Sequence, residues 1–164
     1  APEVSLGHPY GCEIDVWAVG CTLFEMYTGN FLFDGETNNH MLRAIQELRG
    51  GFSHKMIRRS TLRVKAGFDD DFTFYAQPGR HNKKDKKVRP MKFTSPTRDL
   101  FSLLCPPETV AQLSAQEVAK IQLFKDLLEK MLTLDPEKRP TPEELLTHQF
   151  FQSSKPSGGD KARK

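Results

Sequence analysis

Ile14–Tyr27 reads Ile-Asp-Val-Trp-Ala-Val-Gly-Cys-Thr-Leu-Phe-Glu-Met-Tyr, and Thr28-Gly29 follow it. The apolar residues of this stretch leave no polar stripe, so the pattern fits either a helix that is apolar on all sides or a buried strand. Its length favours the helix, and Gly29 is a residue type that commonly ends one. A helix that is apolar on every side belongs in the interior of a protein. We therefore expect Ile14–Tyr27 to be the central helix of the fold.

Other segments also have helical patterns, with recognisable starts. Thr37–Leu48 carries one apolar stripe and stops at Gly50-Gly51, which is typical of an amphipathic helix. We expect four of its polar residues to lie off that stripe: Asn38, Asn39, Gln46 and Glu47. Ser114 and Thr141 each stand three residues before a glutamate, the spacing of a capping box, and helical patterns follow both. The sequence thus predicts a mainly α fold with little strand.

Residues 50–110 lack a sustained period and read as an insertion. Its first half is aromatic, and we expect Phe68–Tyr75 to pack on the body of the protein. Gln77–Met91 is predicted to be a solvated loop, and Ser95–Leu100 is predicted to be the start of a helix. Long loops in compact domains are uncommon and are usually functional or disordered.

The formal net charge of +3 hides an uneven distribution. The basic loop, residues 80–92, has seven basic residues and one acid, and the tail, residues 152–164, has four basic residues and one acid. The rest of the chain therefore carries about −6. A general nucleic-acid-binding domain spreads its basic residues over the body, so that class is disfavoured. The loop is interpreted as solvated, with RNA contact as an alternative, and the tail as disordered.

Cysteine and histidine usage favours a reduced, intracellular compartment. The three cysteines form no Cys-x-x-Cys pair, and the five histidines show no zinc spacing. We therefore expect no metal site. No apolar run approaches the roughly 20 residues of a membrane helix, so we expect no membrane partner.

Motifs of known chemistry are missing from the sequence. There is no glycine-rich phosphate loop, no His-Arg-Asp and no Gly-x-Ser-x-Gly, and Asp71-Phe72-Thr73 lacks the glycine of a magnesium-binding Asp-Phe-Gly. We predict that no residue of this chain is catalytic or binds a cofactor, and that the chain alone is inactive.

Three charged residues invite opposing interpretations. Glu3 and Arg139 are either solvated charges or partners, because a guanidinium offers five donors to a carboxylate. Spacing alone favours solvated charges. Asp15 either receives hydrogen bonds within an apolar environment or is stabilised by the helix dipole near an N-terminus. The sequence alone favours neither of these two possibilities for Asp15.

Taken together, three segments resemble the C-terminal part of a eukaryotic protein kinase domain. Ala1-Pro-Glu3 resembles the Ala-Pro-Glu that closes the activation segment, Asp15-Val-Trp17-Ala-Val-Gly20 resembles the start of helix F, and Asp135-Pro-Glu-Lys-Arg139 resembles the segment whose arginine pairs with that glutamate. The long insertion and the Leu-Asp-Pro-x-Lys-Arg form resemble the CMGC group of serine/threonine kinases. Phe31–Leu42 and Lys55–Arg59 resemble the pre-mRNA processing (splicing) kinases.

The resemblance implies a partial kinase domain over residues 1–151: an incomplete C-terminal lobe with helices F to I and the CMGC insertion. It implies that Glu3 and Arg139 form a buried pair, that Asp15 accepts hydrogen bonds from the catalytic-loop backbone, and that Trp17 and Gly20 pack helix F. ATP and Mg²⁺ are expected for the parent enzyme, whose binding residues would precede Ala1.

The predicted function is that of part of a nuclear serine/threonine kinase acting on splicing factors, with this piece as the substrate-side scaffold. The alternative is a non-catalytic protein-interaction module derived from a kinase lobe. An upstream His-Arg-Asp and Asp-Phe-Gly would favour the first.

Overall fold

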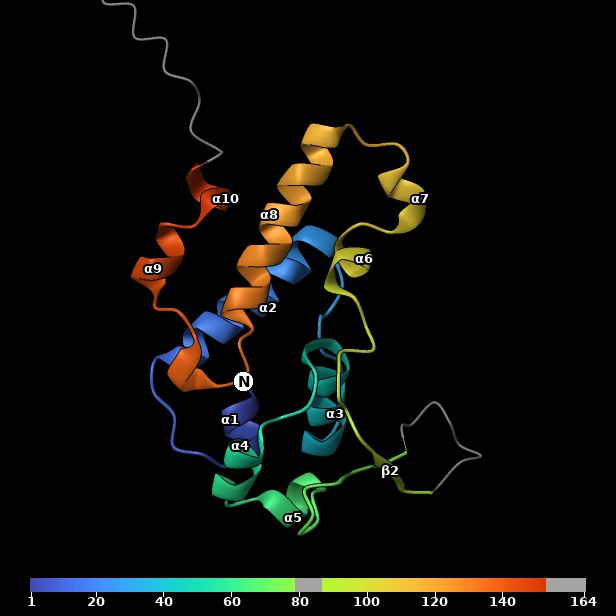
Figure 1. Cartoon of the computed structure of the whole chain (residues 1–164), viewed down its shortest axis with the longest axis vertical. Helices are drawn as coiled ribbons and strands as arrows, with labels where there is room; N and C mark the ends of the chain where they lie inside the picture. Colours follow the sequence, from blue (N-terminus) through green and yellow to red (C-terminus); the bar gives the residue numbers. More distant parts are fainter. Residues whose placement is uncertain (79–86, 153–164) are drawn as a thin grey trace, which may run out of the picture.

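Figure 1 shows the computed structural model, which describes residues 1–78 and 87–152. The longest helices, α2 (Glu13–Thr28) and α8 (Ala115–Met131), pack against each other in the middle of the molecule. The short helices α9 (Pro142–Leu146) and α10 (Gln149–Gln152) flank one side of α8, while α6 (Leu100–Leu104) and α7 (Pro107–Val110) lie towards the other. The prediction of a mainly α fold is confirmed.

The remaining elements of the described residues are four helices, a pair of strands and a 3₁₀ turn. They are α1 (Pro2–Leu6), α3 (Asn38–Arg49), α4 (His54–Arg59), α5 (Arg63–Ala66), the antiparallel strands β1 (Phe74–Ala76) and β2 (Arg89–Met91), and the 3₁₀ turn η1 (Pro136–Lys138). In Figure 1, α1, α4 and α5 lie near one another below α2, and the strand pair projects beside α3.

Both predicted capping boxes are present and explain where α8 and α9 begin. The Ser114 hydroxyl accepts a hydrogen bond from the Glu117 amide, and the Glu117 carboxylate accepts one from the Ser114 amide. Thr141 and Glu144 repeat this exchange at the start of α9, with Pro142 at the first helical position. Each exchange satisfies two amides that a helix start otherwise leaves without partners.

The central helix is buried on one side and exposed on another. Val16, Trp17 and Phe24 of α2 are buried, but Val19 is 49% exposed and Met26 is 77% exposed. Ile14–Tyr27 is therefore the central helix as expected, but it is enclosed on one side only in this chain. One apolar face of α2 is covered by α8, and another lies open.

The amphipathic helix is confirmed as α3, with Thr37 as its N-cap. Two residues that we expected off the apolar stripe are nevertheless 2% exposed: Asn39 and Gln46. The Asn39 side chain donates to the carbonyls of Ala66 and Tyr75 and accepts from the Gln77 amide. It is buried because it supplies hydrogen bonds to backbone groups that pack against α3.

The insertion is more ordered than predicted. Phe68 and Phe74 are buried as expected, with ring centroids 5.0 Å apart. However, Arg89–Met91 of the expected loop is strand β2, which pairs with β1. The helix expected to start within Ser95–Leu100 is α6, and Asp99 is its N-cap, because the Asp99 carboxylate accepts a hydrogen bond from the Ser102 amide. Most of the basic loop and residues 153–164 of the tail lie outside the described residues.

Candidate functional site

The centre of the candidate site is an ion pair between α1 and the segment that follows η1. Arg139 Nη1 lies 2.8 Å from Glu3 Oε1, and Nη2 lies 3.1 Å from Oε2, so the guanidinium contacts both carboxylate oxygens. Both side chains are 0% exposed. The structure thus brings together two residues that are 136 positions apart in the sequence. Bidentate pairs of this kind combine strong attraction with a fixed geometry.

Arg139 makes three further contacts that extend this pair into a junction. Its Nη1 donates to the Glu13 carbonyl (2.6 Å) at the start of α2, and its Nε donates to the Thr133 carbonyl (3.0 Å) just after α8. The guanidinium carbon lies 5.2 Å from the ring centroid of Trp17, within the range of a cation–π contact. One side chain therefore fixes α1, the start of α2 and the end of α8 relative to one another.

Trp17 connects this junction to the loop between α2 and α3. Its ring stacks on Phe33, with centroids 5.6 Å apart, and it is 3% exposed. The neighbouring Leu32 is also 3% exposed. The loop between α2 and α3 therefore packs on the tryptophan that belongs to the same junction.

Gly20 sets how closely α2 and α8 approach. A β-carbon at this position would lie 3.1 Å from Met131 Cβ and 3.5 Å from a Leu132 methyl carbon. A larger residue would therefore push the two helices apart, and glycine lets them pack closely. Both neighbours belong to the buried core.

Asp15 lies apart from the junction. It is exposed in the first turn of α2, where the helix dipole favours a carboxylate. It also lines an apolar groove of about 340 Å³, formed by one face of α2 together with α8, α9 and α10. The apolar lining includes Val19, Leu23 and Leu146. The structure thus places Asp15 at an open apolar surface and not in an enclosed one.

The cysteines offer no activated nucleophile at the junction. Burial, partly offset by Arg139, raises the pKa of the Cys21 thiol to about 11, so the thiol is protonated at neutral pH. Within residues 1–78 and 87–152, no group of three or more His, Cys, Asp or Glu side chains is placed to hold a metal ion. In the same part of the chain, no helix is both long and apolar enough to span a membrane.

A second charged contact was not predicted from the sequence. Glu137 of η1 accepts from Lys55 Nζ at 2.9 Å and from Arg59 Nη1 at 2.7 Å, and all three side chains are more than half exposed. These two cations lower the pKa of Glu137 to about 2. The contact ties α4 of the insertion to the loop that carries Arg139. Basic residues at i and i+4 of a short helix were the available signal, but their partner could not be found from spacing.

The chain belongs to the protein kinase family: a protein kinase domain model matches residues 1–151. Within that family it is similar to particular serine/threonine-protein kinases. It is 46% identical over 151 residues to the serine/threonine-protein kinase prp4 of Schizosaccharomyces pombe, covering 92% of this chain. It is 43% identical over 152 residues to the serine/threonine-protein kinase prpf4B of Dictyostelium discoideum, covering 93% of this chain.

A more distant relative is the human dual specificity tyrosine-phosphorylation-regulated kinase 4, which is 33% identical over 159 residues. The matched region spans 31% of prp4, 18% of prpf4B and 26% of the human kinase. The chain therefore corresponds to less than a third of the length of these relatives. The resemblance to the pre-mRNA processing kinases, first drawn from the motifs, is confirmed by the similarity to prp4 and prpf4B.

Proposed function

We propose that this chain is part of a serine/threonine kinase that transfers the γ-phosphate of ATP to splicing proteins in the nucleus. Membership of the kinase family and the similarity to prp4 and prpf4B support this proposal. Residues 1–151 would be the part of the large lobe that runs from the activation-segment end through helices F to I. Residues 50–110 would be the CMGC insertion, and residues 152–164 a basic tail.

The role we propose for this part is to hold the end of the activation segment in place. The observation that carries it is the junction at Arg139, where a fully buried guanidinium joins Glu3 to α2 and α8. Phosphoryl transfer depends mainly on positioning and electrostatics, so a misplaced activation segment would impair the reaction without any loss of a catalytic group. Trp17 and Gly20 would support the same arrangement through the packing of α2.

We propose that ATP and Mg²⁺ are bound by other parts of the parent, and that this chain alone binds neither and is inactive. The groove on α2 would be covered by the portion of the kinase domain that carries the catalytic loop. Asp15, at the rim of that groove, would then accept hydrogen bonds from the catalytic-loop backbone. Its exposure in the present chain is compatible with a partner of this kind.

The test compares the parent kinase with variants at the junction. Arg139→Met should lower phosphate transfer to a protein substrate and also lower the melting temperature. Arg43→Met is the matched control, because Arg43 makes only a partly buried pair with Glu47 one helical turn away. An Arg139→Met enzyme with full activity and an unchanged melting temperature would refute the proposed role.

The apolar groove also favours a second candidate, a non-catalytic interaction module, because an open apolar surface suits a protein partner. The two candidates differ in what happens when the rest of the kinase is present. In the parent kinase, the thiol introduced by Val19→Cys should be protected from alkylation if the kinase domain covers the groove. Labelling of that introduced thiol at the rate of an exposed one would favour the module.

A further inference from the structure

His148, between α9 and α10, is buried with both ring nitrogens hydrogen-bonded. Its side chain is 5% exposed, Nε2 lies 2.8 Å from Asp126 Oδ2, and Nδ1 lies 3.2 Å from the Phe150 amide nitrogen. A backbone amide can donate but not accept, so Nδ1 must be the acceptor. Nε2 then carries the proton and donates to Asp126. The arrangement requires the neutral form of the ring.

The bond to the Phe150 amide lies in the first turn of α10. The Phe150 ring packs on Phe124 of α8, with centroids 5.3 Å apart, and Phe124 is 7% exposed. Phe124 in turn lies 5.3 Å from the Tyr27 ring, and Phe151 lines the apolar groove on α2. The position of α10 therefore decides how much of this aromatic cluster and of the groove is covered.

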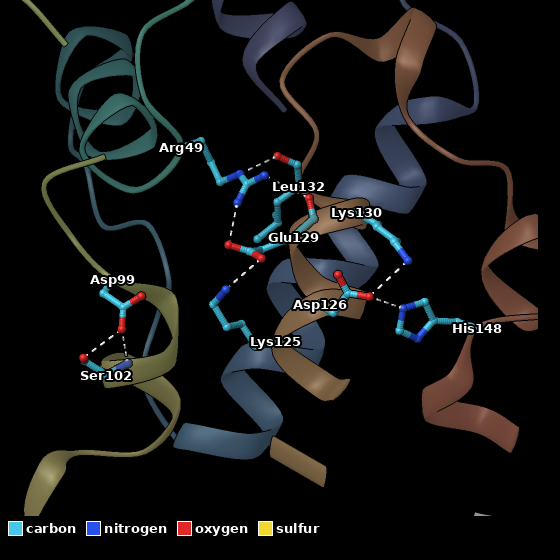
Figure 2. Close-up of polar contacts among 9 residues, drawn as sticks. All are labelled: Arg49, Asp99, Ser102, Lys125, Asp126, Glu129, Lys130, Leu132 and His148. Carbon is cyan, nitrogen blue, oxygen red and sulfur yellow. Dashed lines mark hydrogen bonds and ion pairs between the residues drawn. The ribbon is translucent and has the colours of Figure 1, made fainter. Parts of the chain in front are cut away.

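Charged groups surround the ring on the side away from α10. Asp126 Oδ2 also accepts from Lys130 Nζ at 3.0 Å, as Figure 2 shows, so His148 and Lys130 share one carboxylate oxygen. The His148 hydrogen bond is the largest of the contacts that lower the pKa of Asp126. Beside the ring is an open cavity of about 670 Å³. Its charged and titratable lining residues come from α8, η1, α9 and the connecting segments: Asp126, Lys130, Glu137, Lys138, Arg139, Glu144 and His148 itself.

Several of these groups are already paired elsewhere. Arg139 is bound to Glu3, and Glu137 is bound to Lys55 and Arg59. Glu144 accepts from the Thr141 amide in the capping box. Asp126 is thus the carboxylate that contacts the ring directly.

We propose that His148 is a protonation-sensitive latch for α10. A proton added to Nδ1 places two donors opposite each other, so the hydrogen bond from the Phe150 amide to the ring is lost. The Nε2 contact to Asp126 is kept and gains charge, so the ring stays on α8 while the Phe150 amide loses its bond to the ring. The Phe151 amide still donates to the His148 carbonyl and the Gln152 side chain to the Thr147 carbonyl, so the first turn of α10 loosens over Phe124 without detaching.

The test is amide hydrogen exchange of Phe150 in the full chain, measured by NMR at about pH 7.5 and about pH 5.5. Rates are expressed as protection relative to the intrinsic rate at each pH, and α8 amides report on global stability. Wild-type protection at Phe150 should fall by about fivefold at the lower pH, the factor that corresponds to one ordinary hydrogen bond. Protection in α8 should be unchanged.

Two variants separate the latch from a simple packing role. His148→Asn places an amide oxygen, which gains no proton in this range, near the position of Nδ1. It should keep Phe150 protected at both pH values. His148→Gln can reach Asp126 but not the Phe150 amide, so protection should be low at both. Equal wild-type protection at the two pH values, or a parallel fall in His148→Asn, would overturn the proposal.

Discussion

Replacing Arg139 by methionine should destabilise the chain more than any change at a surface charge. The substitution roughly preserves the length of the side chain but removes the guanidinium. It leaves the Glu3 carboxylate fully buried without its bidentate partner, and it removes a donor from the carbonyls of Glu13 and Thr133. Removing one partner of a buried pair costs about 3–5 kcal/mol, because the remaining charge is left in a medium that solvates it poorly.

Urea unfolding followed by the fluorescence of Trp17 measures this cost directly. Trp17 is the chain's one tryptophan, and it lies against the guanidinium, so its emission reports on the junction itself. With a slope of about 2 kcal/mol per molar urea, the midpoint for Arg139→Met should fall by about 2 M. Arg43→Met, which breaks a partly exposed pair between residues four apart on a helix, should cost about 0.5 kcal/mol or less.

A double-mutant cycle then tests whether the cost comes from the pair. Glu3→Gln removes the buried negative charge while preserving the shape of the side chain. In the Glu3→Gln background, Arg139→Met should therefore cost less than in the wild type, since no carboxylate is left unpaired. Equal costs in the two backgrounds, or a cost for Arg139→Met as small as that of the Arg43 control, would refute the reasoning.

Three further perturbations probe other contacts. Asn39→Ala leaves buried backbone groups of the insertion without partners and should cost about 1–3 kcal/mol for each, measured by urea unfolding. The pKa of Glu137 is depressed to about 2, so its contribution should be full above the ordinary carboxyl pKa and be lost as the pH falls towards 2. The difference in stability between wild type and Glu137→Gln, followed by acid titration, should shrink over that range. Alkylation at neutral pH should label the exposed Cys12 well before Cys21, whose pKa is raised to about 11 by burial, and mass spectrometry of a time course would show it.

Helices with local start signals could be predicted from the sequence. The capping boxes at Ser114 and Thr141 depend on residues three apart, and their hydrogen bonds form within one helical turn. The apolar stripe of α3 was also read correctly, because helical periodicity depends on near neighbours in the chain. Features encoded within a few residues were thus recovered with no knowledge of the packing.

Features that depend on distant partners were missed or misread. Asn39 was expected on the polar side of α3, but its side chain serves backbone groups 27 to 38 residues away. Strand β2 was expected to be loop, since a three-residue strand containing a proline has almost no pattern of its own. Its pairing with β1 is what defines it.

The candidate site shows the same division. Spacing alone favoured solvated charges for Glu3 and Arg139, and the resemblance to kinases was needed to expect a pair. The structure supplied the rest of the junction, namely the carbonyls that Arg139 binds and its contact with the Trp17 ring. For Asp15, the structure shows an exposed position in the first turn of α2. The hydrogen bonds that it would accept from the catalytic-loop backbone are part of the proposed function.

The distance along the chain between the two halves of the junction has a consequence for synthesis. Glu3 leaves the ribosome 136 residues before Arg139 does, which at 5–20 residues per second is a delay of about 7–27 s. During that interval α1 cannot complete its final packing, because the carboxylate that must be buried has no counter-charge. The burial of α1 is therefore completed only after almost the whole segment has been translated.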